Sequence, residues 1–325
     1  MESQHYFNPY SGQTFVGFFI VLFHRLWLFL SGQLAYADMI SDEIQMVVLI
    51  GVSASTALVG CFLVLRKMTM LANSLSHTIL LGIVLVYMAS CHGFFCQAGH
   101  GSLINIQAML AAAVLMGIVT AFLTEFLTKT AKLQEDASIG IVFTSLFALG
   151  VILLTMVTRN AHIGTEVVMG NVDALQLDDC RLVWIIFLMN LVLVLLFFKE
   201  YKITTFDPGL ARAIGISLAF FNYLLMVQVS ITAVGAFRAV GVLMVLSFIT
   251  GPVLTARLLT DSLKKMLIYS VLLGSLASII GVALARHILS VHEIALSTGG
   301  IVVCTIAAMF LIVLTGKSAF ASQKH

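Results

Sequence analysis

The sequence predicts an all-α, polytopic membrane protein with about eight to ten transmembrane helices, and two observations carry that prediction. The first is composition: 60% of the 325 residues are hydrophobic, 10% are charged, and the mean hydropathy is +1.08. Soluble domains carry about 25% charged residues, so this chain lacks the polar surface that a water-facing domain needs. The second is distribution: long apolar runs recur with only short polar breaks, which leaves no room for a soluble catalytic domain.

The apolar runs locate the spans, because a helix needs about 20 apolar residues to cross a hydrocarbon core of about 30 Å. Ten segments qualify, at residues 14–30, 46–65, 74–91, 103–127, 137–157, 182–198, 217–237, 239–259, 266–286 and 298–316. The first is the weakest, since His24 and Arg25 lie inside it; an uncleaved signal anchor and an interfacial helix are alternatives for it. Small residues recur on two other spans and predict close helix packing: Gly51, Ser55 and Gly60, then Gly274, Ser278 and Gly281.

Basic residues orient the spans, because short cytoplasmic loops retain Lys and Arg. Placing Arg66 and Lys67 inside puts most of the 17 basic residues on that side, whereas Arg159, Arg181 and Arg286 fall outside. The cytoplasmic set then also includes Lys129, Lys132, Lys199, Lys202, Arg212, Arg257, Lys264, Lys265, Lys317 and Lys324. The C-terminus lies in the cytoplasm, and so does the N-terminus if the first span crosses.

The opposite face is acidic and rich in histidine. It carries Asp38, Asp42, Glu43, Glu166, Asp173, Asp178, Asp179 and Glu293, with His92, His100, His162, His287 and His292. Imidazole and carboxylate are natural ligands of divalent metals, so these residues are compatible with metal arriving on this face. The alternative is that loops simply hold polar residues, and none of the histidines shows ligand spacing on a predicted helix.

A polar pair at Asn73 and His77 opens the span that follows the basic turn. The two residues are four apart, so on a helix both side chains share one face with Cβ atoms about 6 Å apart. That geometry suits two ligands of one ion. It suits equally a hydrogen-bonded pair that ties two helices together. The spacing alone leaves both interpretations open.

A short helix is predicted in the cytoplasmic segment from Asp207 to Gly215. Asp207 is a good N-cap, Pro208 fits the first helical position, and Gly215 suits the helix end. A short helix between two spans is what a membrane domain needs to dock a soluble partner, although an ordinary loop helix is the alternative.

A Gly-rich break separates the spans on either side of Arg238, with Gly235 before it and Gly241 after it. The break places the Arg238 charge at the outer mouth of the bundle. Pro252 is expected to break the following helix, because proline removes a backbone hydrogen bond and kinks a helix. Broken helices commonly border translocation pathways, so we expect Arg238, Gly241 and Pro252 to act as a gate or kink.

Several function classes are excluded or disfavoured. A net charge of +2 without a Lys/Arg cluster gives no basis for nucleic-acid binding. The chain has no HExxH, Walker A or GxSxG motif, so it is not expected to be an enzyme. No CxxC occurs, and the five cysteines are too scattered for a disulfide scaffold or a zinc finger, although one external disulfide is compatible: Cys61, Cys91, Cys96, Cys180 and Cys304.

Five sequence blocks in register resemble the permease subunits of bacterial ABC importers for manganese, zinc and iron. The resemblance runs from about Met46 to Gly316. The blocks are Phe62–Met68 continuing to Leu75–His77 and Gly82; Glu135–Ile141; Met169–Asn171; Asp207, Ala211 and Gly215; and Ala239–Gly241 through Pro252–Leu259. The resemblance implies a metal-permease domain at 46–316, preceded by an extra span and linker at 1–45 and followed by a cytoplasmic tail at 317–325.

The resemblance also implies partners, location and cargo. The expected partners are ABC ATPase subunits, which hydrolyse the ATP, an extracytoplasmic metal-binding protein, a second identical or different permease, and membrane lipid. The expected location is the bacterial cytoplasmic membrane. No permanently bound cofactor is expected; Mn, Zn or Fe is the substrate. Residues Asp207, Ala211 and Gly215 correspond to the loop that couples to the ATPase.

The metal path of the family falls on Asn73 and His77 in this sequence, and here the chain departs from the pattern. Where the family has an aspartate, this chain has Asn73, which offers an oxygen but no negative charge. The change implies altered selectivity or a heterodimer whose second permease supplies the carboxylate. Two alternatives to an ABC permease are a gradient-driven transporter, for which Glu125 is the acidic candidate, and a structural or assembly membrane protein.

Overall fold

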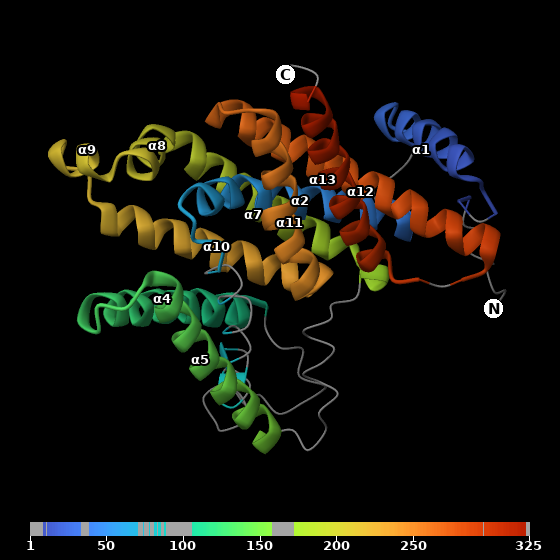
Figure 1. Cartoon of the computed structure of the whole chain (residues 1–325). Helices are drawn as coiled ribbons and strands as arrows, with labels where there is room; N and C mark the ends of the chain where they lie inside the picture. Colours follow the sequence, from blue (N-terminus) through green and yellow to red (C-terminus); the bar gives the residue numbers. More distant parts are fainter. Residues whose placement is uncertain are drawn as a thin grey trace.

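A computed structural model gives the structure of the chain and describes residues 9–10, 12–33, 39–70, 74, 78, 81–82, 84–85, 88, 106–157, 172–294 and 296–322. Regular structure in these residues is helical (Figure 1). The helices are α1 (Phe15–Leu30), α2 (Ser41–Leu65), α4 (Ile106–Thr130), α5 (Glu135–Val157), the 3-10 turn η2 (Val172–Ala174), α7 (Leu177–Leu196), α8 (Phe198–Phe206), α9 (Pro208–Ala213), α10 (Leu218–Val240), α11 (Val242–Leu259), α12 (Leu263–His292) and α13 (Thr298–Ser322).

Six of these helices are long and apolar enough to cross a membrane, counting only the described part of the chain. They are α2, α5, α7, α10, α12 and α13. The apolar helices α1 and α11 are shorter, and most of the predicted span 74–91 lies outside the described residues. The all-helical, polytopic membrane fold is therefore confirmed.

Helix α2 occupies the centre of the bundle and packs against α7, α10, α11 and α12. Buried residues make up 89% of its most apolar window, against 17% for α13 and 22% for α5. Phe62, Leu49 and Val48 on α2 are fully buried. Helices α4 and α5 form a separate pair that reaches the bundle through α10 (Figure 1). Helix α2 is therefore a core helix that contacts protein around its circumference.

Small residues allow this close packing, as the sequence predicts. A Cβ atom placed on Gly60 of α2 would lie 2.4 Å from the carbonyl oxygen of Ile249 on α11. A Cβ on Gly274 of α12 would lie 1.9 Å from Ser53 Oγ. Both contacts are closer than any real Cβ contact, so the backbones approach here because the side chain is absent.

The Gly60→Ala change should destabilise the bundle, because the added methyl group meets backbone of α11 that cannot rotate away. Overpacking of this kind costs about 1–3 kcal/mol. The measurement is the temperature at which the detergent-solubilised chain loses its monodisperse size-exclusion peak. Gly140→Ala on α5 is the matched control, since nothing lies within 4 Å of a Cβ there. Equal midpoints for the two variants would contradict the packing argument.

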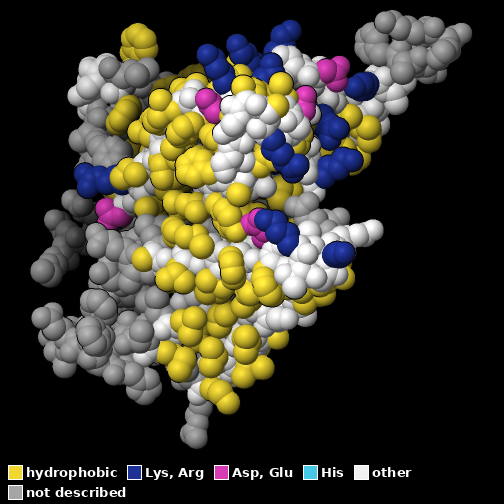
Figure 2. Space-filling view, turned by 90° about the vertical axis from the view of Figure 1, so that its left-hand side faces the viewer, with side chains coloured by type: hydrophobic (Ala, Val, Ile, Leu, Met, Phe, Trp, Pro, Cys, Tyr) yellow, Lys and Arg dark blue, Asp and Glu magenta, His cyan; other side chains and the backbone are white. Residues whose placement is uncertain are grey.

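The two ends of the bundle differ in charge. One end carries α8, α9 and the start of α12, and its exposed basic residues are Lys202, Arg212, Lys264 and Lys265. Figure 2 looks onto this end and shows Lys and Arg side chains gathered over its upper part. We call it the basic end. The opposite, acidic end carries Asp42, Glu43, Asp173 and Asp179 at the starts of α2, η2 and α7. This separation matches the charge asymmetry that the sequence predicts.

Candidate functional site: a short helix at the basic end

The predicted short helix is present as α9, and local chemistry fixes both of its ends. The Asp207 carboxylate caps the first turn by accepting a hydrogen bond of 2.9 Å from the Leu210 amide. At the other end, Ile216 donates to the Ala211 carbonyl over 2.9 Å, across a Gly215 with φ of +83°. This is a left-handed C-terminal cap that favours glycine. A six-residue helix is only marginally stable in isolation, so the two caps fix where α9 begins and ends.

The outer face of α9 is apolar and about half exposed among the described residues. Ala211 is fully buried against the bundle and anchors the helix. Phe206 at the end of α8, Leu210 on α9 and Ile214 at the C-cap of α9 are 58%, 49% and 57% exposed. We call these three residues the α9 stripe. The stripe lies beside Arg212 at the basic end, where Figure 1 shows α8 and α9 together.

Arg66 holds the support of α9 in place. Its guanidinium donates to Thr204 Oγ1 over 2.8 Å and to Thr205 Oγ1 over 3.1 Å, both on α8, and to Asn222 Oδ1 on α10. It therefore joins the end of α2 to the helices on either side of α9. Burial lowers the pKa of Arg66, but arginine stays protonated in proteins, so these are charge-assisted hydrogen bonds.

The predicted break between two spans is a single residue. Gly241 adopts φ of +80° and separates α10 from α11. Arg238 lies in the last turn of α10, and its side chain is outside the described part. The predicted interruption at Pro252 does not occur: α11 runs continuously from Val242 to Leu259 with Pro252 inside it. Pro252 instead packs near Gly274 of α12, where the small residue leaves room for the ring. A gating role for these residues stays a prediction.

The predicted metal pair, Asn73 and His77, lies outside the described residues. Within the described bundle, some buried polar side chains bond to one another across helices. Asn190 of α7 donates to Ser55 Oγ of α2 over 2.8 Å and to Thr232 Oγ1 of α10 over 2.6 Å. Asn190 thus joins three helices, the usual role of a buried amide in a membrane bundle.

The acidic residues at the other end serve mainly as caps and ion pairs. Asp42 pairs with Arg286 over 2.9 Å, and Asp173 accepts from Thr298 Oγ1 over 2.6 Å. No group of three His, Cys, Asp or Glu residues that could hold a metal occurs among the residues searched, which are the described ones. Glu125, the acidic candidate for ion coupling, pairs with Lys129 on its own helix and accepts from Tyr223. These contacts give Glu125 a local structural role.

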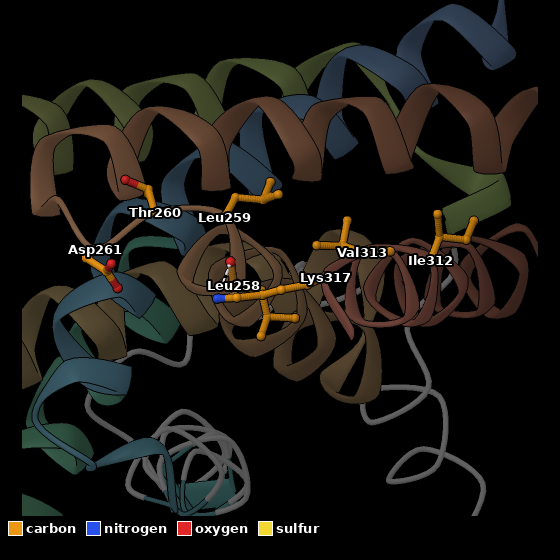
Figure 3. Close-up of a pocket in the computed structure, with 8 residues that line it drawn as sticks. Leu258, Leu259, Thr260, Asp261, Ile312, Val313 and Lys317 are labelled. Atoms are coloured by element: carbon orange, nitrogen blue, oxygen red, sulfur yellow. Dashed lines mark hydrogen bonds between the residues drawn. The ribbon is translucent and has the colours of Figure 1, made fainter. Parts of the chain in front are cut away.

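A shallow cavity of about 530 Å³ lies between the ends of α11 and α13 (Figure 3). Lys317 donates to the Leu258 carbonyl over 2.8 Å and so caps the end of α11. The lining includes Ile312 and Val313, and Asp261 is its one carboxylate. A mainly apolar lining with a lysine beside it does not suit a dication, so this cavity is not a candidate metal path.

Sequence reasoning missed three features: the α9 stripe, the hydrogen bonds of Arg66 and the Asn190 contacts. Helical spacing gives no signal for the first, because the break at Asp207 separates Phe206 of α8 from Leu210 of α9. A lone asparagine inside an apolar span was a signal for the third. The partners of Arg66 carry no local signal.

The fold defines an integral membrane protein with several spans and a short capped helix at its basic end. Comparison with known proteins identifies the family: the sequence matches the ABC 3 transport family over residues 39–317. The chain belongs to this family, and it is a multi-pass, non-catalytic membrane permease of an ABC transporter complex. Membership rules out the gradient-driven and purely structural alternatives.

Similar proteins span most of the chain. A "probable metal transport system membrane protein" of Chlamydia trachomatis is 40% identical, covering 94% of this chain and 93% of its own. The manganese transport system membrane protein MntD of Bacillus subtilis is 39% identical, covering 72% and 79%. The zinc transport system membrane protein TroD of Treponema pallidum is 38% identical, covering 73% and 65%.

Solved structures show the same fold. PsaBC from Streptococcus pneumoniae in complex with Fab is 29% identical, covers 83% of this chain and 89% of its own, and has a TM-score of 0.69. An inward-facing metal-chelate type ABC transporter is 15% identical, with a TM-score of 0.59 over 84% and 85%. The second likeness is evidence for the fold alone.

Proposed function

We propose that this chain passes divalent metal ions across the bacterial cytoplasmic membrane into the cell, as the permease subunit of an ATP-driven importer. An extracytoplasmic protein delivers the metal, and separate ATPase subunits hydrolyse the ATP. Two permease chains, identical or different, complete the path. The basic end faces the cytoplasm, in keeping with the retention of Lys and Arg there.

The observation that carries this proposal is the α9 stripe. An apolar surface at the basic end, held by a capped helix and a buried arginine, suits contact with a soluble protein on the cytoplasmic side. Apolar side chains exposed together on a polar end of a protein are compatible with an interaction surface. Residues Asp207 and Gly215 shape the helix, and Ala211 anchors it, which gives each predicted coupling residue a physical role.

Manganese and zinc are the favoured substrates, because relatives over most of the chain are named for them. Iron remains a candidate from the sequence resemblance. These dications share nitrogen and oxygen ligands, and selectivity among them depends on geometry more than on intrinsic affinity. His77 and Asn73 are the proposed ligands on the path. The neutral Asn73 would hold a dication more weakly than aspartate does.

The proposal is tested by ATP hydrolysis in proteoliposomes that contain this chain, its ATPase and its binding protein. Mn²⁺, Zn²⁺ and Fe²⁺ are titrated separately, with and without a second permease chain. We expect one metal to stimulate hydrolysis. Stimulation only when the second permease is present would identify a heterodimer and explain Asn73. No stimulation in any combination would contradict import of these metals.

The ligand assignment has its own test in the same vesicles. His77→Ala should lower metal uptake while the complex still assembles, because a path residue contacts cargo and not a subunit. Asn73→Asp should strengthen metal capture or change the preferred metal, since it restores a negative charge. Uptake at the parental level in both variants would remove these residues from the path.

A further inference from the structure

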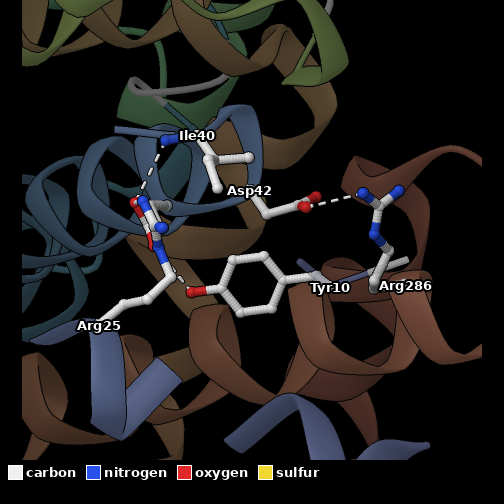
Figure 4. A network of polar contacts seen from close by, with 6 residues as sticks. Tyr10, Arg25, Ile40, Asp42 and Arg286 are labelled. Atoms are coloured by element: carbon white, nitrogen blue, oxygen red, sulfur yellow. Dashed lines mark hydrogen bonds and ion pairs between the residues drawn. The ribbon is translucent and has the colours of Figure 1, made fainter. Parts of the chain in front are cut away.

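The short helix α1 is anchored to the acidic end of the bundle by one buried carboxylate. Glu43 of α2 accepts a hydrogen bond of 2.8 Å from Tyr10 and forms an ion pair with Arg25 (Figure 4). Its second oxygen accepts from the Ile40 amide over 3.1 Å and from Arg25 Nη2 over 3.3 Å. Tyr10 is fully buried, and its pKa is raised by burial and by Glu43, so it remains a donor.

The anchors join α1 to the start of α2 and to the last two turns of α12. Asp42, next to Glu43, pairs with Arg286, so this level of α2 matches the Arg286 level of α12. The Phe15 ring, at the start of α1, lies 6.4 Å from the ring of His287, the next residue of α12. Arg25, in the second half of α1, pairs with Glu43 near the start of α2. Figure 1 shows α1 beside this end of α12, at the opposite side of the molecule from α9.

Length also argues against a crossing. Sixteen residues give a helix of about 24 Å, whereas the hydrocarbon core is about 30 Å thick. A helix of this length, held at Phe15 and Arg25 by the acidic ends of α12 and α2, cannot extend to the basic end. Its axis must instead lie largely parallel to the plane of the membrane.

The outward face of α1 is strongly apolar. Val16, Ile20, Phe23 and Trp27 are 67%, 66%, 67% and 71% exposed. Their spacing of four, three and four residues places them on one face. The exposed His24 lies within this face, and a polar group there is costly deep in lipid but not at an interface. Trp is also favoured at the membrane–water interface.

We propose that α1 is an interfacial helix that lies in the lipid leaflet at the acidic end, with both of its ends on the same side of the membrane. Its apolar face, formed by Val16, Ile20, Phe23 and Trp27, contacts lipid, and Glu43 holds it to α2 through Arg25 and Tyr10. Gln13 and Gln33, which flank α1, therefore lie on the side opposite the basic end. This inference does not depend on which metal the protein carries.

Cysteine labelling in intact cells tests the topology. In a full-length chain whose five native cysteines are replaced by alanine, single cysteines are placed at Gln13 and Gln33, which flank α1. Asp178→Cys marks the acidic end and Asp261→Cys marks the basic end. With a membrane-impermeant maleimide, both flanking positions should follow the Asp178 reference. If either follows the Asp261 reference, α1 crosses and the proposal fails.

Fluorescence quenching tests the lipid contact without altering the cysteines. The two native tryptophans, Trp27 and Trp184, are replaced by Phe, and Phe23→Trp provides a single reporter. Lipids carrying a nitroxide near the headgroup should quench this reporter at least twofold more than lipids labelled near the chain end. Stronger quenching by the deep label would place α1 across the membrane. No quenching by either would show that protein covers this face.

Discussion

Replacing Leu210 with aspartate is expected to release the ATPase subunit from the permease. Burial of a leucine side chain contributes about 1.5–3 kcal/mol, and a charge placed in an apolar contact adds a desolvation cost. Because each 1.4 kcal/mol corresponds to about tenfold in affinity, recovery of the ATPase with the tagged permease should fall more than tenfold. The measurement is the ratio of ATPase to permease after affinity purification in detergent.

Leu296→Asp is the matched control for this experiment. Leu296 is 51% exposed, close to the 49% of Leu210, but it lies between α12 and α13 at the other end of the chain's spans. This variant should retain the ATPase. An unchanged ratio for Leu210→Asp, or an equal loss in both variants, would mean that α9 does not form the contact. Membrane insertion should be normal in both.

Arg66→Ala should have the second largest effect, because it removes the three hydrogen bonds that fix α8 and α10 around α9. Hydrogen bonds to charged groups contribute about 1.5–3 kcal/mol each. We therefore expect a lower unfolding midpoint together with several-fold weaker metal stimulation of ATP hydrolysis. Both readouts come from one purified preparation, by thermal unfolding in detergent and by the proteoliposome assay.

The neighbouring Lys67→Ala provides the control for Arg66. Lys67 follows it directly at the end of α2 and carries the same charge, yet it is exposed. Loss of Lys67 removes a charge without removing the contacts to Thr204, Thr205 and Asn222. Equal effects of the two substitutions would attribute the result to net charge at the basic end, and the positioning role of Arg66 would be wrong.

The sequence predicted those parts of the site that depend on local chemistry. Asp207 and Gly215 bracket α9 because an N-cap and a left-handed C-cap are decided by residues within one turn. Gly241 marks the junction of α10 and α11 for the same reason. The helix break predicted at Pro252 was wrong, because α11 continues through this proline. The neighbouring helix α12 has the small Gly274 at this point, which leaves room for the proline ring.

The unpredicted parts depend on contacts between distant segments. The partners of Arg66 follow it by 138 to 156 residues, so only the folded bundle reveals that it supports α9. Hydropathy likewise marked residues 14–30 as a span, because apolar content reports neither depth nor direction. The ion pair of Arg25 with Glu43 supports the proposed interfacial position, and the crossing predicted for residues 14–30 stays untested.

The burial of α2 also has a consequence for biogenesis. Helix α2 ends at Leu65, but α12, which covers much of it, begins at Leu263. At about 5–20 residues per second, synthesis of the intervening chain takes roughly 10–40 s. During that time α2 lies in lipid without α12. Its side chains must therefore be compatible with lipid first and with a protein interior later. This sequence of events explains why a helix that ends up surrounded by protein still has the hydropathy of a lipid-facing span.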